Sequence, residues 1–293
     1  MAIPRSRHVK YLFRFFVILS GIFLLPHVAI NAFYYPDNEI YNPTPAAAES
    51  VFFTANDGTR LHGWFIPSAT GPAENAIATV IHAHGNAGNM SAYWPLVSWL
   101  PERNMNLFMF DYRGFGESGG SPSPEGLLDD TRSAMDYVRH RAGVNPERLV
   151  LLGQSLGGNN VLAAVGHCMG CINEQQGDRT GVRAIILDST FSSYSAIASQ
   201  KIPGSGFLLD DRYSADRHIA SIAPVPLLIL HGTNDRVIPW QQSETLFARA
   251  GEPKQKRLIP QGEHIDAFSE RHGDLYRDAV IDFILLALKS GSL

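Results

Sequence analysis

The feature that most constrains the fold of this chain is a serine between glycines, where an apolar strand meets a helical segment. The apolar run Leu149–Leu152 leads directly into Gly-Gln-Ser-Leu-Gly-Gly at residues 153–158, and a helical pattern follows from Asn159. In such a turn the serine backbone is strained, and side chains in place of the flanking glycines would collide with the neighbouring strand and helix. We therefore expect Ser155 to present its hydroxyl above a sheet, at the positive end of a helix.

Short apolar runs alternate with longer helical patterns along the rest of the chain. The helical patterns include a start signal at residues 123–125 and an apolar stripe over residues 275–288. The first two apolar runs flank an Asn-Asp-Gly turn at residues 56–58, which favours an antiparallel hairpin. The alternation predicts an α/β fold with an eight-stranded, mostly parallel sheet and helices on both faces. The expected strands are Val51–Thr54, Leu61–Ile66, Ile77–Ala83, Leu107–Phe110, Leu149–Leu152, Ala184–Leu187, Leu227–Leu230 and Arg257–Ile259.

Two further side chains at predicted strand ends complete a candidate catalytic set. Asp235 follows the seventh predicted strand and His264 follows the eighth, where open α/β sheets build their sites. They follow Ser155 in the order serine, acid, histidine. We expect His264 to take the proton of Ser155, and Asp235 to hold the imidazole in the correct tautomer. Asp188, directly after the sixth predicted strand, is an alternative acid, although Asp235 is favoured.

Two backbone N–H groups are candidates for an oxyanion hole. The first belongs to Leu156, the residue after the candidate nucleophile. The second belongs to Asn86, in the glycine-rich loop at residues 82–89 that follows the third predicted strand. The glycines of this loop would let its backbone approach a substrate closely. A phosphate-binding loop is excluded, because no Gly-Lys-Ser/Thr follows.

The beginning of the chain differs from the rest in composition. A basic cluster precedes an apolar stretch that runs from Phe15 to Phe33, which is typical of a signal peptide or a single membrane anchor. Cleavage after Ala32 would release the body, whereas an uncleaved segment over residues 1–33 would anchor it. Both alternatives predict an exported body, on the periplasmic or extracytoplasmic side. The basic side chains are Arg5, Arg7, Lys10 and Arg14.

A compositional boundary separates this segment from the body of the chain. Residues 34–49 are rich in Pro, Asn, Tyr and Ala, which favours an extended linker. The catalytic domain is expected to occupy residues 50–293.

Charge and cysteine content narrow the possible classes of function. The net charge is −4, and the basic residues cluster only at the beginning, so we expect no nucleic-acid partner. The two cysteines, Cys168 and Cys171, could close a small disulfide or remain free thiols. His167 is adjacent, but no second cluster completes a metal site. No metal or organic cofactor is expected.

Four motifs of this chain resemble those of the α/β-hydrolase superfamily, and the first is the most discriminating. They are His-Gly-Asn-Ala-Gly-Asn at residues 84–89, Asp-Tyr-Arg-Gly-Phe-Gly-Glu-Ser at residues 111–118, the serine turn at residues 153–158 and the segment around Asp235.

The resemblance extends over roughly residues 34–289 and is greatest to a membrane-anchored branch often labelled serine-aminopeptidase-like. Eukaryotic members of that branch include protein depalmitoylases and lysophospholipid hydrolases. The resemblance implies an α/β-hydrolase fold with a cap inserted over residues 189–221, and a mainly architectural role for residues 113–118. In this sequence the cap region is short and lacks a large extra domain, a departure that limits what the resemblance implies. The His-Gly-Gly-Pro-Gly loop of true proline-releasing peptidases is absent, which puts an aminopeptidase activity in doubt.

Together these features predict a carboxylic ester or thioester hydrolase that acts on a small-molecule or lipid-like acyl substrate. A peptidase or amidase with the same triad, and an inactive relative that binds an acyl ligand or a partner, are the alternatives. Several apolar residues of the expected cap could line an acyl-binding groove, or simply pack over the sheet. They are Ile202, Pro203, Phe207, Leu208 and Leu209.

Overall fold

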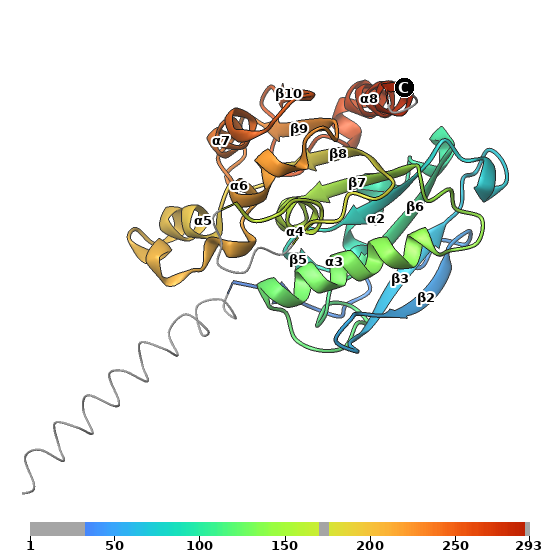
Figure 1. Ribbon diagram of the computed structural model, residues 1–293, viewed down its shortest axis with the longest axis horizontal. Helices are drawn as coiled ribbons and strands as arrows, with labels where there is room; N and C mark the ends of the chain where they lie inside the picture. The colour runs from blue at the N-terminus through green and yellow to red at the C-terminus, as the bar shows by residue number, and fades with distance from the viewer. Residues whose placement is uncertain (1–32, 170–175, 291–293) are drawn as a thin grey trace, which may run out of the picture.

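The computed structural model describes residues 33–169 and 176–290, in which eight strands form one central sheet (Figure 1). The strands are β2 (Glu49–Thr54), β3 (Arg60–Ile66), β4 (Ala78–Ala83), β6 (Met105–Asp111), β7 (Leu149–Gln154), β8 (Val182–Asp188), β9 (Leu227–Gly232) and β10 (Lys254–Ile259). Their order across the sheet is β10-β9-β8-β7-β4-β6-β3-β2. All eight predicted strands are therefore found in one sheet, as predicted for an α/β fold.

Neighbouring strands of the sheet run parallel, except where β3 pairs with its two neighbours. β4 and β6 to β10 run parallel, whereas β3 is antiparallel to both β2 and β6. The predicted hairpin is thus the antiparallel edge of the sheet. Every residue of β4, β6, β7 and β9 is buried, because helices cover both faces of these inner strands.

The described residues form seven α-helices, and their apolar residues fall into two cores. One core holds residues of α3, α4, α5, α6 and α7, and the other holds residues of α2 and α8. Leu151 faces the first core and Val150 faces the second, as strand alternation requires. The helices are α2 (Met90–Val97), α3 (Pro124–Arg139), α4 (Leu156–Val165), α5 (Tyr194–Lys201), α6 (Ala215–His218), α7 (Gln241–Arg249) and α8 (Leu275–Ser290).

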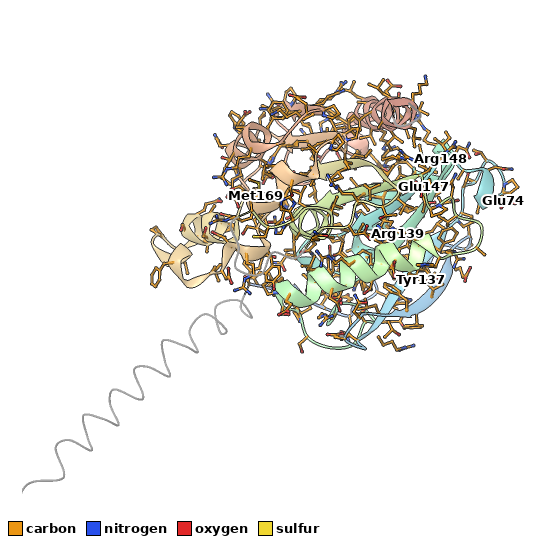
Figure 2. All side chains as sticks on the ribbon, viewed as in Figure 1. Glu74, Tyr137, Arg139, Glu147, Arg148 and Met169 are labelled. Atoms are coloured by element: carbon orange, nitrogen blue, oxygen red, sulfur yellow. The ribbon has the colours of Figure 1, made fainter. Side chains whose placement is uncertain are left out.

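The predicted start signal of α3 is confirmed. Ser123 is the N-cap, and its hydroxyl accepts a hydrogen bond from the N–H of Gly126 at 3.0 Å, with Pro124 in the first turn. Arg139 lies at the other end of this helix (Figure 2). Its Nε donates to the carbonyl of Thr180 at 3.1 Å. α3 is therefore tied to the chain that enters β8.

The cap between β8 and β9 is small, as the short length of residues 189–221 predicts. It consists of α5, α6 and short 3₁₀ turns, with no large inserted domain between Ser189 and Ser221. Leu209 packs against the core, whereas Ile202 and Phe207 are 66% and 85% exposed. The packing interpretation therefore holds for Leu209, and the acyl-groove interpretation of the exposed residues stays a prediction.

The segment after residue 33 is extended but is held against the body. A two-residue strand β1 (Tyr35–Pro36) pairs in parallel with β5 (Ala87–Gly88), in the loop between β4 and α2. The predicted membrane segment, apart from Phe33, lies outside the described residues. In the part of the chain that the structure describes, no helix has the length and apolarity needed to cross a bilayer.

Candidate active site

The turn between β7 and α4 holds Ser155 in a strained conformation. Ser155 has φ of 54° and ψ of −115°, which a residue with a side chain rarely adopts. Its N–H donates to the carbonyl oxygen of Asp188 at 2.8 Å, which joins the turn to the end of β8. Backbone strain of this kind persists only where the surroundings impose it, and it concentrates at functional sites.

The glycines around Ser155 are required by close backbone approaches. A Cβ atom added at Gly153 would lie 2.5 Å from the Cα atom of Gly158, in the helix that follows. At Gly157 it would lie 1.9 Å from the carbonyl oxygen of Ala83 in β4. The expected collisions with the neighbouring strand and helix are therefore present in the structure, and they explain the spacing of the motif.

The structure brings together the three residues expected to form the triad. Nε2 of His264 lies 3.1 Å from Oγ of Ser155, and Nδ1 of His264 lies 2.8 Å from Oδ2 of Asp235. Because the Asp235 carboxylate can only accept, Nδ1 carries the proton, and Nε2 is left free to accept a proton from the serine. The arrangement can therefore deprotonate a hydroxyl and stabilise the imidazolium that results.

Asp235 is held in place by donors on both of its oxygens. Oδ1 accepts the N–H groups of Val237 and Ile238, each at 2.8 Å. Oδ2 accepts from His264 and lies 3.2 Å from Nε2 of His231. Burial opposes ionisation of the carboxyl, but hydrogen bonds from His231, His264 and the backbone outweigh it and hold the pKa of Asp235 well below its usual range. The carboxyl is therefore ionised at neutral pH.

His231 is a residue of this site that the sequence analysis missed. Its Nε2 atom also lies 2.9 Å from the carbonyl oxygen of Ile238, so it carries a proton shared between two acceptors. The side chain is fully buried in β9, four residues before Asp235. A histidine inside the strand that precedes the acid was the available signal, and we infer that it fixes the carboxylate.

The alternative acid, Asp188, has different partners. Its Oδ2 accepts a hydrogen bond from Nε2 of Gln154 at 3.0 Å, and the amide oxygen of Gln154 accepts from His82 at 2.9 Å. Burial raises the pKa of Asp188 to about 6, although the bond from Gln154 opposes the rise. No hydrogen bond joins Asp188 to His264 among the described residues, so the geometry favours Asp235 as the acid.

One of the two expected oxyanion donors lies within the serine turn, and the other lies in the loop after β4. Leu156 is the first residue of α4, so its N–H has no acceptor within the helix. Asn86 follows Gly85, where an added Cβ atom would lie 3.4 Å from Cβ of Ser155. The same atom would lie 2.4 Å from the hydroxyl of Tyr93, a buried neighbour of the loop that the sequence analysis did not single out.

The loop after β6 is bound to elements away from the three candidate catalytic residues. Nε of Arg113 donates to Asp130 at 3.0 Å, and its Nη1 donates to Asp57 at 2.7 Å. The hydroxyl of Ser118 donates to the carbonyl of Asp111 at 2.7 Å. These contacts join the loop to α3 and to the β2–β3 turn, in keeping with the architectural role implied by the resemblance.

Metal-ligating residues do not cluster in the described part of the chain. Within residues 33–169 and 176–290, His, Cys, Asp and Glu side chains form no group of three or more that could hold a metal ion. Cys168 is disulfide-bonded, and Cys171 lies outside the described residues.

Comparison with known proteins identifies the class. A family model described as serine aminopeptidase S33 matches residues 74–191, from just before β4 to just after β8. The chain belongs to the α/β-hydrolase superfamily and is a hydrolase of that class.

Individual relatives agree with this assignment. The chain is 75% identical to the uncharacterized protein YfhR of Salmonella typhimurium, over 97% of both chains. It is 29% identical to the alpha/beta hydrolase domain-containing protein WAV2 of Arabidopsis thaliana, over 92% of this chain and 91% of that protein. Among solved structures, the Pyrococcus furiosus esterase Pf2001 has the same fold, with a TM-score of 0.69 at 17% identity over 87% of this chain and 99% of that one.

Proposed function

We propose that this protein is a serine hydrolase that cleaves carboxylic ester or thioester bonds through an acyl-enzyme intermediate on Ser155. The observation that carries the proposal is the unbroken chain of contacts from Oγ of Ser155 through His264 to Asp235. It begins at a serine in a strained turn, which a simple binding protein would not need.

The proposed reaction has two halves, formation of the acyl-enzyme and its hydrolysis, and the same side chains act in both. Nε2 of His264 takes the proton of Ser155 as Oγ attacks the substrate carbonyl carbon, and the electron pair of the C=O bond moves to oxygen. The N–H groups of Leu156 and Asn86 stabilise that negative charge. The electron pair on that oxygen then re-forms the C=O bond as the bond to the leaving group breaks, and His264 gives its proton to the leaving group. Water activated by His264 attacks the acyl group in the same way and releases the acid, which restores Ser155.

The proposed substrate is lipid-like in its acyl part. Phe207 and Ile202 expose apolar side chains on the cap, and α5 of the same cap contacts the beginning of the described chain. The rings of Phe33 and Tyr194 lie 5.2 Å apart, in an edge-to-face arrangement. If residues 1–33 anchor the protein or direct its export, as proposed, the exposed side chains of the cap would lie close to an extracytoplasmic membrane surface.

A peptidase or amidase with the same residues is the second candidate. It is favoured by the description of the matching family model, serine aminopeptidase S33. Several solved structures with the same fold are esterases by name, which favours the first candidate. Parallel assays with matched ester and anilide substrates of one acyl group distinguish the two, because only the leaving group differs.

A fluorophosphonate probe tests the nucleophile directly. We expect wild type and Ser121→Ala, which changes an exposed serine, to be labelled, and Ser155→Ala to remain folded without label. Esters of graded chain length, tested in parallel, then give the acyl preference. If folded wild type is not labelled, the hydrolase mechanism fails and a role in binding an acyl ligand or a partner takes its place.

A further inference from the structure

The first described residues of the chain lie against the loop that carries one of the proposed oxyanion donors. We call residues 33–42 the arm. The side chain of Asn86 holds the arm at two points: its Nδ2 donates to the carbonyl of Phe33 at 2.6 Å, and its Oδ1 accepts the N–H of Tyr35 at 3.3 Å. Since both ends of the side-chain amide are engaged, the position of Asn86 depends on the arm.

Further contacts extend this junction along the loop. Asn89 donates to the carbonyl of Glu39 at 2.7 Å, and its side-chain oxygen caps α2 at the N–H of Ser91. The hydroxyl of Ser91 accepts the N–H of Tyr41 at 3.0 Å, and its carbonyl accepts from Nδ2 of Asn42 at 2.9 Å. Together with the pairing of β1 and β5, these bonds hold residues 86–89 of the loop against the arm.

The other side of the same loop contacts the nucleophile turn. A Cβ atom added at Gly85 would lie 3.4 Å from Cβ of Ser155, and one added at Gly157 would lie 1.9 Å from the carbonyl oxygen of Ala83 and 2.7 Å from that of His84. The loop therefore lies between the arm and α4. The arm itself is tied to the cap at its start, where the hydroxyls of Tyr34 and Tyr194 lie 3.4 Å apart.

We propose that the arm positions the oxyanion loop, and that the Asn86 side chain is the positioning residue that sets the direction of its own backbone N–H. This inference rests on the proposed function, because an oxyanion donor has a role only if Ser155 attacks a carbonyl. A donor of this kind acts on the charge that develops in the transition state, so its displacement lowers kcat more than it raises KM.

The test compares Asn86→Ala and Asn42→Ala in the full chain. Asn145→Ala is the control, because Asn145 holds an exposed turn through the N–H of Glu147 and touches neither arm nor loop. Losing one oxyanion donor costs about 100- to 1000-fold in kcat. Asn86→Ala keeps its N–H but loosens it, so we expect a loss of about 10- to 100-fold with KM within about threefold. Asn42→Ala should lose about threefold, and the control should be unchanged.

An alkyl boronic acid supplies a second readout, since its adduct on Ser155 places an anionic oxygen in the oxyanion hole. The inhibition constant of the boronic acid should rise by the same factor by which kcat falls. A general loss of stability would not produce this proportionality. If thermal denaturation shows that Asn86→Ala is unfolded, kcat and the inhibition constant of Asn42→Ala are compared with those of wild type in its place. Unchanged kcat in folded Asn86→Ala and Asn42→Ala, or a rise in KM alone, would overturn the inference while Ser155 keeps its role. Wild type no more active than Ser155→Ala would overturn both.

Discussion

Replacing Asp235 by Asn tests the geometry of the proposed triad most sharply. The two carboxylate oxygens accept only from donors: backbone N–H groups of Val237 and Ile238 on one side, and the rings of His264 and His231 on the other. An asparagine has one acceptor and one donor group. In either orientation its NH₂ group therefore faces donors, either the two backbone N–H groups or the two rings.

The size of the effect follows from the tautomer of His264. If the NH₂ group faces the rings, the histidine must accept at Nδ1 and carry its proton at Nε2, where it can no longer accept the proton of Ser155. A wrong tautomer of this kind costs about 10³- to 10⁴-fold in kcat, or about 4 to 5 kcal/mol of transition-state stabilisation. Unsatisfied donors at this buried site should also lower the free energy of unfolding by about 1–3 kcal/mol.

Asp188→Asn is the matched control for this substitution. Asp188 accepts from Nε2 of Gln154 and from the hydroxyl of Ser189, and an asparagine can satisfy both partners, because a hydroxyl also accepts. We expect its kcat on a short chromogenic ester to stay within about tenfold of wild type, with Asp235→Asn far below it. The reverse order, with both variants folded by circular dichroism, would refute the assignment and give the acid role to Asp188.

Three further predictions concern stability and substrate. Gly157→Ala should lower the free energy of unfolding, measured in urea, by about 3 kcal/mol, because its Cβ would lie 1.9 Å from a β4 carbonyl oxygen. Gly71→Ala is the control and should change this free energy little, because its Cβ would have no atom within 4 Å. Burial raises the pKa of Asp188 to about 6. The protonated carboxyl therefore contributes fully to stability below its pKa in the unfolded chain, near 4, and this contribution is lost as the pH rises to about 6. The free energy of unfolding of Asp188→Asn, relative to that of wild type, should therefore rise by roughly 2–3 kcal/mol between pH 4 and 7. A difference that does not change with pH would contradict this. Phe207→Ser should lower turnover of a long-chain ester in phospholipid vesicles by about tenfold without affecting a soluble short-chain ester, and Leu275→Ser, at a similarly exposed apolar position on α8, should affect neither.

The fold could be predicted from the sequence because its signals are local. A continuous apolar run, a turn that only glycine tolerates and a helix start each depend on neighbouring residues, so they can be recognised without knowledge of distant contacts. The serine turn is the best example. A side chain at Gly153 or Gly157 would collide within the turn or with the adjacent strand, and the sequence shows this need directly as the two glycines of the motif.

The arm and His231 could not be predicted in the same way, because their roles depend on distant parts of the chain. The composition of residues 34–49 favours an extended linker, and in the structure this segment combines a short strand at residues 35–36 with a bend at 41–42 and a turn at 46–47. What composition does not show is that asparagines about fifty positions further on supply the hydrogen bonds that hold it, at Asn86 and Asn89. His231 likewise gains its role only when the turn after β9 folds Asp235 back onto it.

The choice between the two candidate acids depends on where each carboxylate leaves its strand. Asp188 is the last residue of β8, so the pleat of the sheet fixes the direction of its side chain, which lies fully buried against Gln154. Asp235 lies three residues beyond the end of β9, where the turn is free to carry its carboxylate toward His264. Both residues follow apolar runs in the sequence, and a strand boundary uncertain by a residue or two hides this difference. An acid on the loop side of that boundary can reach a histidine on the neighbouring loop, whereas an acid on the strand side is confined to the interior.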